Sequence, residues 1–239
     1  MAADVVDLRD FYRSALGQVA RRMIRRAIQR VWPDLNGMRL LGIGYATPFL
    51  SALSSETERT LAVMPASLGV LRWPAEGRNL VSLAEEGELP FADYSLDRVV
   101  LVHALETSEE TGALLKEIWR VLAGGGRVLI VAPNRRGIWA RLDRTPFGSG
   151  RPYTMSQLSQ LLRDEQFTPV GTDAALFIPP ATSRMMLRAA PAWERIGKRW
   201  FPTFAGVLLV EATKQIYAKP AATRAPRRRL VYTPAPHRL

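Results

Sequence analysis

The 239-residue chain contains no cysteine. This excludes disulfides, thiolate zinc sites and every mechanism that uses a cysteine nucleophile. No apolar run approaches the roughly 18 residues that cross a bilayer. The N-terminus carries Asp4, Asp7 and Asp10, which is unlike the basic and then apolar start of a secretory signal. We therefore expect a protein of the reducing cytoplasm, and we predict no metal site.

Acids are scarcer than bases. The chain has 33 Lys and Arg against 22 Asp and Glu, which gives a net charge of +11. Residues 219–239 hold six of the cations, four prolines and no acid. Such a basic tail predicts contact with a polyanion, either RNA or an anionic surface such as a membrane. The alternative is a disordered, solvated extension that only aids solubility.

The first predicted helix covers residues 7–31. Its apolar side chains recur at helical spacing from Leu16 to Val31, and basic side chains occupy the opposite half of the wheel. The basic residues are Arg21, Arg22, Arg25, Arg26 and Arg30. We expect residues 1–34 to form an amphipathic helix whose apolar stripe packs on the following domain. Binding of this helix to a membrane surface is the alternative.

After residue 37, short apolar runs alternate with helical patterns. The expected strands are 38–43, 60–64, 79–82, 96–102, 127–132, 167–177 and 207–212, and the expected helices are 47–53, 110–122 and 154–165. This alternation predicts an α/β protein with a mostly parallel sheet covered by helices on both faces. A Pro-rich insertion at 178–202 precedes the last strand. We expect its large apolar residues to pack in a core or lid; they include Met185, Met186, Trp193 and Trp200, with Phe201 directly after.

Two segments carry a family resemblance. Residues 89–97 read LPFADYSLD and residues 117–126 read EIWRVLAGGG. They resemble the "LPF-x-D-x-S-F-D" and "E-x-x-R-V-L-K-P-G-G" segments of the type 11 family of class I S-adenosylmethionine-dependent methyltransferases, in that family's order and at its separations. The resemblance spans roughly residues 35–215. It implies a Rossmann-like, seven-stranded, mostly parallel sheet with an antiparallel last strand, and a methyltransferase-like domain at 35–218 with the insertion as lid.

The resemblance also implies S-adenosylmethionine as cofactor, bound across the carboxyl ends of the first strands. Gly42 and Gly44 match the first two glycines of the family's "D/E-x-G-x-G-x-G" loop, where a missing Cβ lets the cofactor approach the backbone. Tyr45 adds bulk to this loop. Glu85 falls where the family has an acid that contacts the adenine amino group, and its neighbour Glu86 is the alternative.

Three positions depart from the family pattern. Leu40 stands where an acid usually opens the loop, and Ala46 replaces the third glycine. Met64 replaces the acid that grips both ribose hydroxyls at the end of the second strand. Losing that charge-assisted contact costs about 1.5–3 kcal/mol, which corresponds to about tenfold to hundredfold in affinity. The pattern thus predicts weakened cofactor binding.

His103, just beyond the fourth strand, is the candidate catalytic base, because an unperturbed pKa near 6.5 suits proton removal at neutral pH. The alternative is a structural histidine at a strand end. Glu106, three residues later, would orient the ring or cap the next turn. The segment His103-Ala104-Leu105-Glu106 replaces the Asn/Asp-Pro-Pro-aromatic sequence of enzymes that methylate exocyclic amino groups, which argues against that class of acceptor.

Two functions follow as hypotheses. The first is an S-adenosylmethionine-dependent methyltransferase acting on an O or N atom of an unidentified acceptor. The second is a non-catalytic protein of the same fold that binds RNA or assembles with partners through the Arg21–Arg30 face and the tail. Leu40 and Met64 motivate the second hypothesis.

Overall fold

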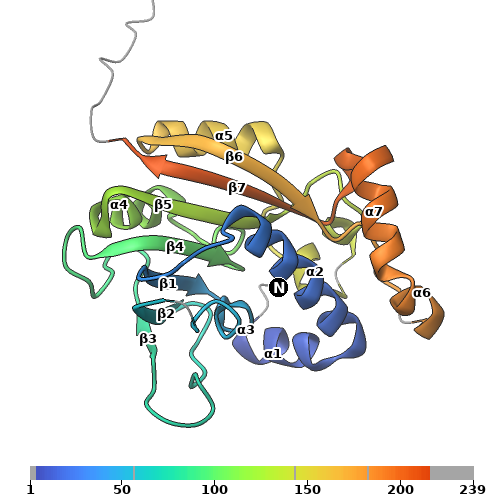
Figure 1. Ribbon diagram of the computed structural model, residues 1–239, viewed down its shortest axis with the longest axis horizontal. Coiled ribbons are helices and arrows are strands. Elements are labelled where there is room, and N and C mark those ends of the chain that lie inside the picture. Colours follow the sequence, from blue (N-terminus) through green and yellow to red (C-terminus); the bar gives the residue numbers. More distant parts are fainter. Residues whose placement is uncertain (1–3, 56, 143, 182, 216–239) are drawn as a thin grey trace, which may run out of the picture.

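The computed structural model describes residues 4–55, 57–142, 144–181 and 183–215. The predicted tail at 219–239 therefore lies outside the described residues. Within them, seven strands form one sheet in the order β3-β2-β1-β4-β5-β7-β6 (Figure 1). The strands are β1 Arg39–Gly44, β2 Arg59–Pro65, β3 Val81–Ala84, β4 Leu96–Val102, β5 Leu122–Pro133, β6 Phe167–Ala175 and β7 Val207–Lys214.

The sheet has the predicted topology. β1, β2, β3, β4 and β5 run parallel, and β7 runs antiparallel to its neighbours β5 and β6. Helices lie on both faces (Figure 1). They are α1 Val5–Arg13, α2 Ala15–Val31, α3 Thr47–Leu50, α4 Thr111–Val121, α5 Met155–Asp164, α6 Arg184–Arg188 and α7 Ala190–Trp200. Two large apolar clusters form the core, one on each face of the sheet. Within the part of the chain that the structure describes, every helix is too short or too polar to cross a bilayer.

The single helix expected at 7–31 is in fact two helices. The chain bends at Ser14, which is extended and accepts a hydrogen bond from the Gly17 N–H at 3.0 Å. A Cβ on Gly17 would lie 1.9 Å from the carbonyl oxygen of Phe11, so only glycine allows the two helices to meet this closely. Sequence periodicity missed the bend because both helices are amphipathic and follow one another without an interruption.

The apolar stripe of α2 is buried, as the sequence predicts. Met23, Ile24 and Ile28 have almost no exposed surface and belong to the core cluster on one face of the sheet. At the edge of the sheet, Arg30 forms an ion pair with Asp173 of β6 at 2.8 Å. The stripe is therefore not available to a membrane, and the alternative that this apolar face lies on a bilayer is wrong for this structure.

Residues 89–97 and 117–126, the two segments that carry the family resemblance, are joined by hydrogen bonds and ion pairs. Arg120 of α4 donates to the carbonyl oxygens of Leu89 (3.0 Å) and Phe91 (2.8 Å) and pairs with Asp93 at 2.6 Å. Glu117 pairs with Arg120 at 2.7 Å and accepts the Leu89 N–H at 2.9 Å. The arginine keeps the pKa of Glu117 below its usual range through this hydrogen bond. These motif residues therefore fix the loop before β4.

Candidate active site

Helix α1 lies across the carboxyl edge of the sheet (Figure 1). It contacts the loops that follow three parallel strands, which is where doubly wound sheets bind ligands. The Val5 N–H donates to the Leu68 carbonyl, in the loop after β2, at 3.0 Å. The Tyr12 ring stacks on Tyr45, in the loop after β1, with 5.8 Å between ring centroids. The Tyr12 hydroxyl reaches His103, directly after β4. The first helix thus covers the predicted cofactor edge.

Three buried side chains form a hydrogen-bonded chain beneath this cover. The Tyr12 hydroxyl lies 2.7 Å from Nε2 of His103, and Nδ1 of His103 lies 3.0 Å from Oε1 of Glu106. A carboxylate only accepts, so Nδ1 carries the proton and Nε2 accepts from the tyrosine. The exposed fractions are 5%, 2% and 3% for Tyr12, His103 and Glu106. Burial, together with the charge of Glu106, raises the pKa of Tyr12 well above 10, so the phenol remains a donor.

Local geometry holds His103 in place. Its backbone has φ of +51°, a left-handed conformation that costs energy for a residue with a side chain. Phe147, in the 3₁₀ turn η2 Pro146–Gly148, packs on the imidazole with 5.0 Å between ring centroids. Among the described residues, Oε2 of Glu106 is buried without a hydrogen-bond partner. A strained residue and an unsatisfied buried oxygen side by side are typical of a functional site.

Of the two predicted loop glycines, Gly44 lies where the strand turns. Its φ is +78°, and a Cβ there would come within 2.4 Å of the Val102 carbonyl oxygen. Gly42 lies inside β1, paired with Ala62 and Val100, and a Cβ would strike Leu50 at 2.6 Å. The strand end therefore favours a family pattern shifted by two residues, with Gly42 at the position of the acid. Both glycines are required by the packing of the chain itself.

The other predicted cofactor-binding residues differ in how far the protein encloses them. Met64 is fully buried, and its sulfur accepts the Leu71 N–H at 3.4 Å. Glu86 accepts hydrogen bonds from the Ser108 hydroxyl at 2.6 Å and the Glu110 N–H at 3.3 Å. Glu85 is exposed at the end of β3. Of the two acids, Glu85 is thus the one left accessible to a ligand.

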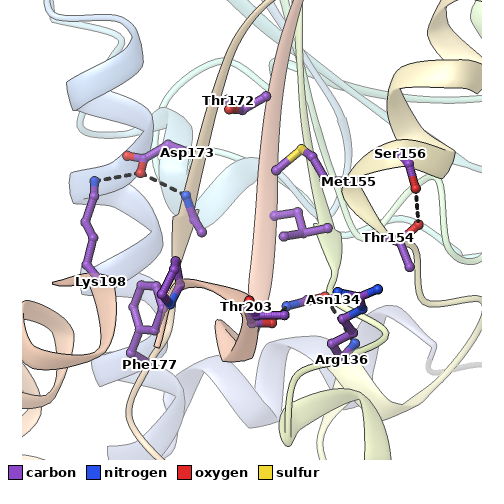
Figure 2. Close-up of a pocket in the computed structure, with 13 residues that line it drawn as sticks. Asn134, Arg136, Thr154, Met155, Ser156, Thr172, Asp173, Phe177, Lys198 and Thr203 are labelled. Atoms are coloured by element: carbon purple, nitrogen blue, oxygen red, sulfur yellow. Dashed lines mark hydrogen bonds and ion pairs between the residues drawn. The ribbon is translucent and has the colours of Figure 1, made fainter. Parts of the chain in front are cut away.

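A separate cavity of about 550 Å³ opens at the carboxyl ends of β5 and β6 (Figure 2). Met155, Phe177 and Leu208 give it an apolar wall, and Arg136 and Lys198 bring cations to it. Lys198 pairs with Asp173 at 2.6 Å. The lining is therefore apolar on one side and carries both signs of charge on the other. None of the predicted site residues lines the cavity.

Residues 40–130 match the sequence profile of a family described as "Methyltransferase domain". This part of the chain is therefore similar to a type 11 methyltransferase domain. A relative from Mycobacterium tuberculosis, named only as an uncharacterised protein, is 30% identical over 118 residues, which are 46% of this chain and 41% of the relative. The demethylmenaquinone methyltransferase of Thermus thermophilus is 28% identical over 131 residues, 53% of this chain and 59% of the enzyme. The chain thus spans about half the length of these curated relatives.

Solved structures agree on the fold. An S-adenosylmethionine-dependent methyltransferase of Thermotoga maritima, described as a possible histamine N-methyltransferase, superposes with a TM-score of 0.60. It is 17% identical, and the match covers 84% of this chain and 91% of that protein. The resemblance found in the sequence is therefore confirmed, as is the seven-stranded Rossmann-like fold.

The cofactor of this methyltransferase family is S-adenosylmethionine. Tyr45, Met64 and His103 retain at most 6% of their surface, because α1 and its neighbours enclose them. With α1 in this position these three residues are closed to a ligand from solvent, whereas Glu85 is exposed. Tyr12 and the helix that carries it therefore cover three of the residues at which the resemblance predicts the site.

Sequence analysis missed Tyr12. It precedes the region that resembles the family, and its partner His103 is 91 positions away. The available signal was the aromatic pair Phe11-Tyr12 within a helical pattern, where a tyrosine on an apolar face needs a buried hydrogen-bond partner.

Proposed function

We propose that the chain is an S-adenosylmethionine-dependent methyltransferase that modifies an O–H or N–H group, with His103 as general base and α1 as a movable cover. The observation that carries this proposal is the hydrogen bond from the Tyr12 hydroxyl to Nε2 of His103. A general base takes a proton on the nitrogen to which Tyr12 donates. The Tyr12 hydroxyl therefore occupies the position that the O–H or N–H group of an acceptor would take.

His103 and Glu106 divide the work of proton transfer. When bound, the cofactor supplies a methyl group activated by its sulfonium. The acceptor atom loses its proton to Nε2 as it gains the methyl group. Glu106, on Nδ1, holds the ring in the tautomer that leaves Nε2 free to accept, and it stabilises the imidazolium that forms. Both groups are nearly without solvent contact, which strengthens their electrostatic interaction.

Opening of α1 precedes binding in this proposal. The cover is held by the Val5–Leu68 and Tyr12–His103 hydrogen bonds and by aromatic packing of Tyr12 on Tyr45. A ligand that binds only the open state shifts the population toward it, and its apparent affinity falls by the fraction of molecules that are open. This cover and the missing ribose-binding acid at Met64 both act to weaken cofactor binding.

Isothermal titration with S-adenosylmethionine and S-adenosylhomocysteine tests the proposal. We expect micromolar binding by the full chain and about tenfold weaker binding by Glu85→Gln, since one hydrogen bond to a charged group is lost. Glu88→Gln changes an equally exposed acid three positions away and is the matched control. Both variants leave the core intact, unlike substitutions at Gly44. Equal affinity in the two variants would remove Glu85 from the site.

The enclosed edge also favours a second candidate, a non-catalytic protein of this fold. Arg21, Arg22 and Arg26 on α2 are exposed and supply a basic face for RNA. Absence of heat at high cofactor concentration, from folded wild-type protein and from Tyr12→Ala, would favour this candidate. We would then measure the association constant for RNA at several salt concentrations. A linear fall of its logarithm with the logarithm of salt concentration, and a smaller slope in Arg21→Gln/Arg22→Gln, would support this candidate.

A further inference from the structure

The insertion before the last strand exposes large apolar side chains. Among the described residues, twelve large hydrophobic side chains are exposed, and half of them lie between residues 185 and 204. These six are Met185, Trp193, Ile196, Trp200, Phe201 and Phe204. Trp200 is 68% exposed and Met185 is 77% exposed. Of the residues expected to pack in a core or lid, Met185, Trp193, Trp200 and Phe201 are exposed, so the expectation of a core is wrong for them. A group of exposed large apolar side chains within one segment is typical of an interaction surface.

The outward orientation of α7 follows from its inner contacts. Gly197 faces Phe177 so closely that a Cβ would lie 2.4 Å from the phenylalanine Cβ. Glu194 accepts the N–H groups of Leu176 and Phe177, each at 3.0 Å. Trp193, Ile196 and Trp200, spaced three and four apart, lie along one side of the helix next to Gly197, and all three side chains are exposed. Figure 1 shows α6 and α7 projecting at one end of the molecule.

Positive charge surrounds this apolar face. Five cations between residues 184 and 199 are exposed, namely Arg184, Arg188, Arg195, Lys198 and Arg199. The one acid in this stretch, Glu194, is used by its backbone contacts. A cleft between α2 and α6 is lined by Arg22 together with Arg184 and Arg188, so the basic surface continues onto α2.

We propose that residues 184–204, comprising α6, α7 and the 3₁₀ turn η3 Pro202–Phe204, dock the protein on an anionic membrane surface. Trp and Phe side chains favour the interface between headgroups and hydrocarbon, and flanking Arg side chains pair with anionic headgroups. The aliphatic side chains Met185 and Ile196 gain from hydrocarbon but have no counterpart in RNA recognition. A second copy of the chain would bring the same cations face to face, which disfavours self-association.

Vesicle flotation of the full chain tests the docking surface. We expect the wild-type protein to float with vesicles of phosphatidylcholine containing phosphatidylglycerol and to bind pure phosphatidylcholine at least tenfold more weakly, because the basic surface attracts anionic lipid. Intrinsic tryptophan fluorescence should shift to the blue on binding, since Trp193 and Trp200 leave water. Failure of the wild-type protein to bind anionic vesicles at low salt would overturn the proposal.

Two pairs of variants separate the contribution of apolar side chains that enter the bilayer from the contribution of positive charge. Ile196→Ser/Trp200→Ser removes exposed apolar groups and should lower the partition coefficient at least tenfold, by the loss of buried apolar area. Ile138→Ser/Val170→Ser removes two exposed apolar side chains elsewhere and should change nothing. Arg195→Gln/Arg199→Gln should weaken binding to anionic vesicles, whereas Arg227→Gln/Arg228→Gln/Arg229→Gln tests whether the basic tail alone accounts for the attraction.

Three results would overturn the proposal. The first is unchanged binding by Ile196→Ser/Trp200→Ser. The second is loss of all binding on neutralising the tail while the surface variants bind normally. The third is a dimer, seen by light scattering, that the apolar variant abolishes, because the face would then belong to a second copy. The cofactor titration is independent of these results, so either proposal can fail while the other stands.

Discussion

The hydroxyl of Tyr12 and Nε2 of His103, 2.7 Å apart, join the first helix of the chain to the carboxyl end of β4. Both groups are buried, and the bond links a segment outside the matched family region to a residue within it. The same atoms take part in closing the site and, in the proposed function, in the chemistry. Removal of the Tyr12 hydroxyl oxygen can therefore test whether this bond keeps the site closed.

Tyr12→Phe deletes the hydroxyl and keeps the ring. We expect the free energy of unfolding to fall by about 1 kcal/mol, the net value of a typical buried hydrogen bond. We also expect S-adenosylhomocysteine to bind up to about fivefold more tightly, because the covered state loses the same energy. Thermal melts and titration calorimetry measure the two effects. Tyr94→Phe, at an exposed position, is the control. Lower stability with unchanged affinity would mean that α1 need not open.

The tautomer of His103 can be observed directly. The chain has only two histidines, so His237→Asn leaves the single imidazole of His103 for nitrogen NMR. We expect a protonated Nδ1 and a bare Nε2, because Glu106 accepts from Nδ1. Glu106→Leu should abolish that preference, while Glu106→Gln should keep it, since its amide oxygen still accepts. A protonated Nε2 in the parent protein would exclude His103 as a base.

Arg120→Met should destabilise the fold by about 2 kcal/mol, since hydrogen bonds to Glu117, Asp93 and two carbonyl oxygens are lost from a half-buried position. Urea unfolding monitored by circular dichroism measures the change. Arg163→Met, on the exposed side of α5, is the matched control and should stay within about 0.5 kcal/mol of the parent. An equal effect of both substitutions would contradict the structural role of the motif arginine.

Acid should destabilise the protein partly through Asp97. Hydrogen bonds from the guanidinium and backbone N–H of Arg39, at 2.9–3.0 Å, hold the pKa of Asp97 below its ordinary value. A depressed folded-state pKa adds stability that is complete above the unfolded value near 4 and disappears as the pH falls through the folded value. Asp97→Asn should therefore flatten the loss of stability below about pH 4. Glu109→Gln, at an exposed acid, should not.

Sequence periodicity predicted the sheet because each strand is marked by a run of apolar residues within its own short segment. β4 has the expected bounds of 96–102, where apolar residues run almost without interruption as in strands buried on both faces. Helix α3 is shorter than the expected 47–53 and ends at Leu50. Four residues carry too little periodicity to fix an end.

The site was less accessible to sequence analysis because its defining contacts are distant along the chain. Glu85 and Glu86 are equivalent on paper, and only the hydrogen bond from Ser108, 22 positions later, separates them. The outward aromatic side chains of α7 posed the same difficulty. Their exposure depends on how the contacts of Gly197 and Glu194 with residues 176–177 orient the helix, and no local pattern records these contacts.

The two ion pairs of Asp173 connect distant parts of the molecule. One carboxylate holds Arg30 of α2 at 2.8 Å and Lys198 of α7 at 2.6 Å, so it links the second N-terminal helix to the projecting insertion. A lipid phosphate that captured Lys198 would leave that carboxylate with Arg30 and the Ala174 N–H as its partners. Docking on a bilayer would then change an ion-pair network that includes α2, the helix joined at Ser14 to the one that lies over the active edge.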